Sequence, residues 1–391
     1  MSEYSTPKLE ALLSCDGYVF EMDSVIEMLG KLGDSRHARG KVYALSTILL
    51  LMLLAKLSGE DSERGMAQWL AERKTELADL LGLEKVRTPC RTTLRRIVTG
   101  IVSVEQLEKL FSTFLQQLTV AGTNVILSVD GKTLRGSVDL TRPRGMHLLA
   151  AYLPEQGVVL FQMNVERKEN EIPVAKRLLK HLDLRGKVVT GDALLTQRKL
   201  CLQIVAAGGH YVFKVKENQP QLYDDIRRLF TDVPVKPDFE TAETVEGTHG
   251  RIDKRTLTVS SLLQPYSDWP HLAQVFQVVH RVTDPHTGVT TEETSYGLTS
   301  LPRSKVTPPQ LLHIHRTHWG IENGLHYRRD VTLQEDHSRV RVKRAPQVMA
   351  ALNNFVLSLF AWLGYENIPQ ARRHLDAHLE KAVALLTRSL S

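Results

Sequence analysis

The sequence contains little cysteine and no cysteine pair at short spacing. Cys15, Cys90 and Cys201 are the only cysteines in 391 residues, and they lie far apart in the chain. An odd number of widely spaced cysteines, without a CxxC pair, argues against a disulfide framework and against a zinc site built on thiolates. This usage favours a reducing, cytoplasmic environment.

The sequence also lacks an apolar run long enough to cross a membrane. Its most apolar stretch, residues 43–59, is interrupted by Ser46, Thr47 and Lys56, whereas a span needs roughly 20 apolar residues. We therefore expect a buried helix there. The first residues show no basic flank followed by an apolar core, which argues against a secretory signal. No internal repeat or low-complexity tract is visible, so we expect a soluble globular protein without a membrane partner.

Lysine and arginine exceed aspartate and glutamate by 50 to 44, which gives a formal charge of +6 and a pI near 9.1. This mild excess favours a polyanionic partner. A length of 391 residues predicts two or three structural units. From the periodicity we expect a helical N-terminal domain at 1–122, an α/β core at 123–216, a mostly β insertion at 217–306, and helices at 307–391.

Helices of the N-terminal region form a candidate DNA-binding head. Thr88 before Pro89 is typical of a helix start. In the following helix Arg91 and Arg95 are four residues apart and share a face, which suits a DNA groove.

Two buried strands of the α/β core end in an aspartate. "VILSVDGKTLRGS" carries Asp130 before Gly131, and "KVVTGDALL" carries Asp192. Neighbouring strands are about 5 Å apart, so the two carboxylates could share a divalent cation. The alternative is that each aspartate only caps a turn. Asp-Gly itself predicts a turn directly after Asp130.

A third acid is expected from the helical segment "HRTHWGIENGLHYRRD". Five titratable or charged residues of this segment are spaced three or four apart, so in a helix they would share one face. They are His315, His318, Glu322, His326 and Arg329. The alternatives are a solvated polar face, or a third ligand among Asp330, Glu335 and Asp336.

Three carboxylates without thiolates suit Mg²⁺ or Mn²⁺ better than zinc, and two such ions can flank a scissile phosphate. A zinc site on His313, His315 and His318 fits poorly, because residues two apart point to different faces of a helix.

Five segments together resemble the DDE transposases of bacterial insertion sequences, in the H-repeat-associated group. They occur in the family's order over nearly the whole chain: "SVDGKTLRGS", "GDALLTQRKL", "GGHYVFKVKENQP", "GTHGRIDKRT" and "HWGIENGLHYRRDVTLQEDHSRVR". The resemblance implies an RNase H-like catalytic domain with a β-rich insertion before the last catalytic helix. It also implies a catalytic and metal-binding triad of Asp130, Asp192 and Glu322.

The activity implied by the resemblance is cleavage of DNA at the ends of a mobile element, followed by joining of the 3′-hydroxyl to target DNA. It uses two Mg²⁺ or Mn²⁺ ions, in a complex with DNA that we expect to contain a homodimer. Wider relatives carry a tyrosine seven residues before the glutamate, an arginine four before and a lysine seven after. This chain has His315, His318 and Arg329 there, and Arg329 would keep the phosphate contact.

Further basic residues are candidates for contacts with DNA. Lys132 and Arg135 would face phosphates, with ordinary surface charge as the alternative. Arg339, Arg341 and Lys343 alternate with valines, so an extended chain would show them on one side; a charged edge strand is the alternative. The remaining candidates are Lys216, His249, Arg251, His318 and His326.

A DNA-binding or regulatory protein with an inactive RNase H-like fold is the alternative function, because a fold alone does not guarantee activity.

Overall fold

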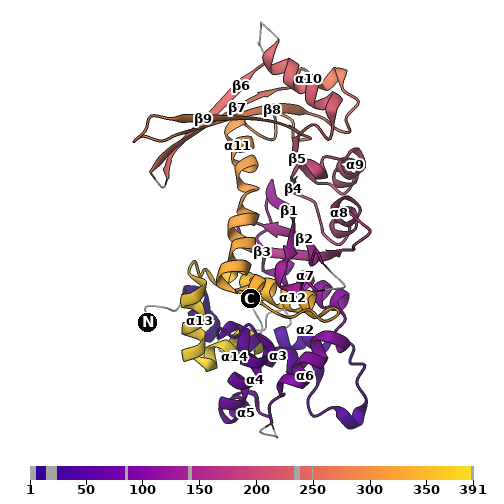
Figure 1. The fold of residues 1–391 in the computed structure, drawn as a ribbon, viewed down its shortest axis with the longest axis vertical. Coiled ribbons are helices and arrows are strands. Elements are labelled where there is room, and N and C mark those ends of the chain that lie inside the picture. The colour runs from indigo at the N-terminus through magenta and orange to yellow at the C-terminus, as the bar shows by residue number, and fades with distance from the viewer. Residues whose placement is uncertain are drawn as a thin grey trace.

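The polypeptide forms an elongated molecule in which a large sheet stands on a body of helices (Figure 1). The structure is a computed structural model that describes residues 6–14, 24–83, 87–139, 143–232, 238–248 and 250–388. The first helices of the chain, in indigo, lie in the same helical body as the last ones, in yellow.

The α-helices of the described ranges are α1 (Pro7–Ser14), α2 (Val25–Gly30), α3 (Leu45–Leu57), α4 (Glu63–Glu72), α5 (Lys74–Leu81), α6 (Arg91–Arg96), α7 (Val104–Leu118), α8 (Glu171–Leu179), α9 (Arg198–Ala206), α10 (Pro220–Thr231), α11 (Pro308–Thr317), α12 (Ala345–Leu363), α13 (Ile368–Ala377) and α14 (Leu379–Thr387). The strands are β1 (Val125–Leu134), β2 (Met146–Leu153), β3 (Val158–Val165), β4 (Lys187–Gly191), β5 (His210–Val215), β6 (Glu240–Thr248), β7 (Arg251–Ser260), β8 (Gln274–Thr283) and β9 (Thr290–Thr299).

These strands form one sheet in the order β3-β2-β1-β4-β5-β9-β8-β7-β6. β1, β4 and β5 are parallel, whereas β2 and β3 form an antiparallel hairpin beside β1. The core runs as three strands, a helix, a strand, a helix and a strand, with α8 and α9 as the crossover helices. The sheet therefore brings the ends of β1 and β4 side by side.

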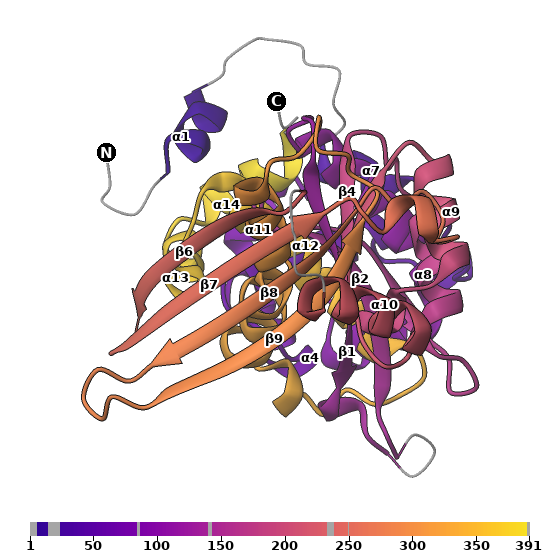
Figure 2. The same cartoon turned by 90° about the horizontal axis from the view of Figure 1, so that it is seen from above.

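The insertion continues the same sheet. β9 pairs antiparallel with β5, and β6 to β9 extend from it as a long arm (Figure 2). The expectation of mostly β structure misses α10. The signal was present in the sequence: Leu222, Ile226 and Phe230 recur every four residues and are all buried, as in an amphipathic helix.

The turn expected after Asp130 is wrong. β1 continues through Gly131 to Leu134, because it is paired with β2 along this whole stretch. Gly131 has a different role: a Cβ at this position would lie 2.3 Å from Glu171 Oε1 and 2.5 Å from His147 Nε2. Glycine here leaves room for the side chains of Glu171 and His147, which are hydrogen-bonded to each other at 2.7 Å.

The helical body is built around apolar helices from both ends of the chain. The buried helix expected in residues 43–59 is confirmed as α3, which has no solvent-facing side and contacts α2, α4, α12 and α14. Each of its fully buried leucines contributes about 1.5–3 kcal/mol. α12 is long and apolar enough to cross a bilayer, but 83% of its 18-residue apolar window is buried, as in a core helix.

The helix expected to start at Thr88 begins later. α6 starts at Arg91 with Cys90 as its extended N-cap, and it passes into a π turn, η2 (Ile97–Ile101). Proline also suits the extended chain before a helix, so Pro89 precedes the helix here.

Candidate active site

Three carboxylates from separate elements line one cleft. Asp130 lies within β1, Asp192 follows β4 directly, and Glu322 lies beyond the end of α11. All three border a cavity of about 820 Å³, here called the acid cleft. Val129 and Gly191 face each other across the parallel β1–β4 ladder, so the next residues of the two strands are also neighbours. The structure thus brings the three expected acids together.

Asp130 is the centre of the closest group. One ligand atom each of Asp130, Glu322 and His326 lie within 4.8 Å of one another. His326 Nε2 is 3.1 Å from Asp130 Oδ2, and this imidazole is only 5% exposed. The sequence suggested His326 as a DNA contact, but its position beside Asp130 is buried. The group can hold a metal ion.

The three carboxyl groups have shifted pKa values. Burial acts to raise the pKa of Asp130, but the hydrogen bond and charge of His326 outweigh it and the net shift is downward. Burial raises the pKa of Glu322, and the charge of Asp130 and a hydrogen bond with it add to the shift. Burial, followed by the charge of Glu171, raises the pKa of Asp192. Carboxylates crowded in this way favour a cation among them.

Asp192 also caps a turn. Its Oδ1 accepts hydrogen bonds from the backbone N–H groups of Leu194 and Leu195, at 3.1 and 3.4 Å, at the start of η4 (Ala193–Leu195). The turn-capping alternative weighed from the sequence is therefore realised, and the capping carboxylate also lines the acid cleft. The cap fixes the carboxylate at the end of β4.

The segment that carries Glu322 is wound as successive π turns, η6 (Glu322–His326) and η7 (Arg328–Thr332). Such turns are frequent at functional sites. A Cβ on Gly324 would lie 2.5 Å from the hydroxyl of Tyr152, so the glycine lets this segment approach β2. The wider winding changes which later residues share a face with Glu322.

Arg329 shows the effect of this winding. The expected phosphate contact is wrong for this structure, because Arg329 is completely buried. Its Nε donates to Glu335 at 2.8 Å and its Nη1 donates to Gln162 on β3 at 2.9 Å. Arg329 therefore forms hydrogen bonds within the protein core.

Lys132 is also turned inward. It is 8% exposed, and its Nζ lies 2.5 Å from Asp330. The expected exposure of Lys132 to DNA phosphates is wrong for this structure, because Asp330 already neutralises the ammonium. Arg135 differs, since 84% of its side chain is exposed.

The rival third ligands all have partners inside the protein. Asp330 pairs with Lys132, Glu335 pairs with Arg329, and Asp336 accepts a hydrogen bond from the backbone N–H of Arg135. Glu322 lines the acid cleft, and none of these three does. The geometry favours Glu322 as the third acid.

Two of the three histidines before Glu322 have lowered pKa values. Burial lowers the pKa of His318 to about 4, and its Nδ1 lies 3.1 Å from Thr190 Oγ1. Burial lowers the pKa of His315 to about 3, and its ring packs edge-on against Phe276. His313 is exposed and bonded to Glu155. Within the described residues, these three histidines do not form a group whose ligand atoms all lie within 4.8 Å of one another.

Two residues of the cleft were not identified from the sequence. Lys214 lies on β5 with its Nζ 5.6 Å from the ring centroid of Trp319, and that indole is 58% exposed. Both residues line the acid cleft, together with the expected Lys216. Burial lowers the pKa of Lys214. The alternation of Lys214 and Lys216 along a strand was the available signal.

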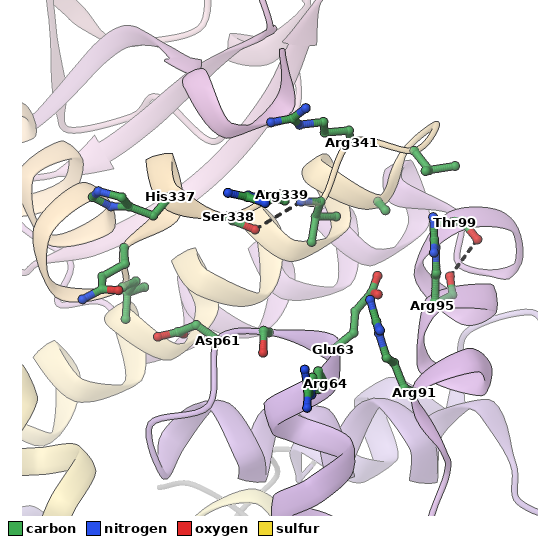
Figure 3. Close-up of a pocket in the computed structure, with 16 residues that line it drawn as sticks. Asp61, Glu63, Arg64, Arg91, Arg95, Thr99, His337, Ser338, Arg339 and Arg341 are labelled. Carbon is green, nitrogen blue, oxygen red and sulfur yellow. Dashed lines mark hydrogen bonds between the residues drawn. The ribbon is translucent and has the colours of Figure 1, made fainter. Parts of the chain in front are cut away.

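The other expected DNA contacts lie elsewhere. Arg91, Arg95, Arg339 and Arg341 line a second cavity of about 350 Å³ (Figure 3). Arg251 begins β7 and is exposed at the end of the arm. His249 lies outside the described residues.

Comparison with known proteins identifies related sequences over most of the chain. A family model described as "Transposase DDE domain" matches residues 122–359, and another, described as "DDE_Tnp_1-associated", matches residues 26–115. The putative transposase YncI of Escherichia coli O157:H7 is 29% identical over 347 residues, which cover 86% of this chain and 87% of the relative. The H repeat-associated putative transposase YhhI of E. coli K12 is 26% identical, with 87% and 90% covered.

Among solved structures, a piggyBac transposase synaptic complex with hairpin DNA aligns with 98% of this chain and 81% of its own. The TM-score is 0.45 and the sequence identity is 12%. A likeness this distant gives no information on individual residues.

Proposed function

The chain belongs to the DDE transposase family, and on this premise we propose that it cuts and rejoins DNA at the acid cleft. The observation that carries the proposal is the convergence of Asp130, Asp192 and Glu322, from three separate elements, on one cavity. The sheet order β3-β2-β1-β4-β5, with α8 and α9 as crossovers, supports an RNase H-like core.

The donor set fits a hard divalent cation. Asp130 and Glu322 would provide carboxylate oxygens, His326 offers a nitrogen at the same point, and Asp192 borders the same cleft. Oxygen-rich sites of this kind suit Mg²⁺ or Mn²⁺, and we propose two ions. When bound, such ions activate an attacking water or 3′-hydroxyl and stabilise the leaving oxygen of the phosphodiester.

The chain's own residues would orient the DNA. Lys214 and Lys216 line the same cleft as the acids, so their ammonium groups would offset the charge of the scissile phosphate. His326 holds Asp130 in place through the 3.1 Å contact. Water would attack first, and the freed 3′-hydroxyl would then attack target DNA. Joining two ends of an insertion sequence calls for two such sites, and hence for a homodimer on DNA.

The test is strand cleavage in Mg²⁺ on DNA that carries the sequences flanking the reading frame. We expect Asp130→Asn, Asp192→Asn and Glu322→Gln to bind this DNA and to cut it roughly 10³-fold more slowly, because the metal-dependent stabilisation of several kcal/mol is lost. Asp336→Asn is the matched control, since Asp336 lies outside the acid cleft. If Glu322→Gln cut at the wild-type rate, the assignment of the third acid would fall.

A further inference from the structure

We propose that the second cavity, here called the arginine cleft, binds backbone phosphates of the same DNA duplex that is cut at the acid cleft. The arginine cleft is lined by guanidinium groups from three separate segments: Arg64 of α4, Arg91 and Arg95 of α6, and Arg339 and Arg341 beyond the π turns. The inference rests on the proposed function and adds a second contact for its substrate.

The arginine cleft carries an excess of positive charge. Within the described residues, Arg64, Arg91, Arg95 and Arg339 form no ion pair with a carboxylate. All four are exposed. Guanidinium groups pair with phosphate oxygens in a bidentate manner, so the cleft is suited to a polyanion.

The two carboxylates at the cleft offset only part of the charge of its five arginines. Asp61 is bonded to Arg372 at 2.7 Å and lies 3.4 Å from the buried ammonium of Lys56. Glu63 interacts with the charges of Arg95 and Arg91, so it offsets at most one of the five guanidinium charges. Figure 3 shows Glu63 beside Arg91, with Arg339 on the opposite wall.

The two walls are fixed to each other before any ligand arrives. Arg344 donates from Nη1 to the carbonyl of Val102 at 3.1 Å and from Nη2 to the carbonyl of Gly100 at 3.2 Å. Both carbonyls lie just beyond α6, whereas Arg344 directly follows the segment with Arg339. A preformed site binds without a cost for ordering its walls.

The same segment is attached to the strand that carries Asp130. Arg341 Nε donates to the carbonyl of Gly136 at 3.2 Å. A Cβ on Gly136 would collide with the carbonyl oxygen of Ser338, so the backbones touch. Gly136 lies in η3 (Arg135–Ser137), directly after β1.

The path from Asp130 to Gly136 is roughly 17 Å, at about 3.3 Å per residue along β1 and about 2 Å per residue in η3. This distance corresponds to about five nucleotides of one DNA strand, at about 3.4 Å each. The arginine cleft would therefore hold the backbone about five nucleotides from the cut bond, and would link α6 to the catalytic strand.

The first experiment measures the affinity of the full-length protein for a 30-base-pair duplex of arbitrary sequence at several salt concentrations. Arg91→Ala and Arg339→Ala should each weaken binding about tenfold and reduce the salt slope by about 0.9. Because the two arginines share one site, the double variant should lose less than the product of the single losses. Arg185→Ala, 81% exposed in a distant turn, should change affinity less than twofold.

Unchanged affinity and salt slope in both single variants, with unchanged thermal unfolding, would overturn the proposal. Fully multiplicative losses would also overturn it, because they would indicate two independent contacts. A mononucleotide that binds wild type, fails to bind Arg91→Ala and leaves the DNA salt slope intact would show a nucleotide site instead.

The second experiment locates the contact on DNA that the wild-type protein cuts. Single phosphates are replaced by neutral methylphosphonates, and binding is measured with Asp130→Asn so that no cleavage occurs. Replacement near the fifth nucleotide from the cut should weaken binding of this protein and have little effect when Arg339→Ala is added. If no such position exists while the wild-type protein still cuts, the proposal for the arginine cleft is wrong and the proposed function stands. If wild type does not cut, the proposed function fails, and the salt-slope test still decides the cleft.

Discussion

The acid cleft and the arginine cleft are opposite in charge and are assembled in different ways. The acid cleft takes Asp130 and Asp192 from paired strands, so the sheet itself sets their spacing. The arginine cleft joins α4, α6 and a segment some 240 residues later in the chain. Each cleft has an excess of charge of one sign. The comparison suggests a division of work, in which one cleft would hold cations at the cut bond and the other would hold phosphates at a distance from it.

Two arginines ten residues apart sharpen this comparison. Arg329 is completely buried and bonded to Glu335 and Gln162, whereas Arg339 is exposed at the arginine cleft. Both residues are arginines, but Arg329 forms hydrogen bonds inside the core, whereas Arg339 is available to a ligand. Substitution should therefore separate stability from DNA binding.

The largest expected effect is on folding. Arg329→Met removes one partner of a buried ion pair and leaves the Glu335 carboxylate uncompensated, so the free energy of unfolding should fall by about 3–5 kcal/mol. Urea unfolding measures this loss. Arg339→Met is the matched control and should change stability by less than about 0.5 kcal/mol. A normal unfolding midpoint for Arg329→Met, together with weakened DNA binding, would contradict this prediction. It would indicate that Arg329 is exposed and contacts DNA.

An intermediate effect should come from the neutral histidine behind the acid cleft. The pKa of His315 is about 3 in the folded protein, against about 6.5 in an unfolded chain. The unfolded state thus binds an extra proton between these values, and stability is lost as the pH falls below about 6.5, by about 1.4 kcal/mol per pH unit.

His315→Leu keeps an apolar contact with Phe276 and should flatten this loss in unfolding measured from pH 7 to pH 5. His286→Gln, at the exposed turn between β8 and β9, is the control for removal of one histidine. Equal acid sensitivity in His315→Leu and wild type would show that the imidazole is not held neutral.

The sequence predicts the core sheet well because its signals are local. Apolar runs ending in Gly-Asp or Asp-Gly predicted β1 and β4. The meeting of Asp130 and Asp192 then follows from parallel pairing. Glu322 could be selected as the third acid from the resemblance. The reason to prefer it to Asp330 is the ion pair of Asp330 with Lys132, which only the folded chain shows.

The remaining features depend on contacts distant in sequence. β1 stays extended at Asp-Gly because β2 pairs with it, which overrides the local turn preference. Helical spacing placed Arg329 on the face of Glu322, but the π turns shift it into the core. The joining of Arg91 and Arg339 in one cleft has no local signal at all, since it arises from the packing of segments from both ends of the chain.

The smallest expected effect tests whether one duplex passes between the two clefts. Arg135 lies in η3, after the strand of Asp130 and next to the segment of Arg339, and 84% of its side chain is exposed. Its pair with Asp336, at 3.7 Å, contributes little at the surface, so Arg135→Ala should leave stability within about 0.5 kcal/mol of wild type. Because one phosphate contact would be lost, the salt slope of DNA binding should fall by at most about 0.9 and affinity by a few-fold. Arg185→Ala again serves as the exposed control. An unchanged slope for Arg135→Ala, beside a reduced slope for Arg339→Ala, would mean that the DNA reaches the arginine cleft by a path that does not follow β1.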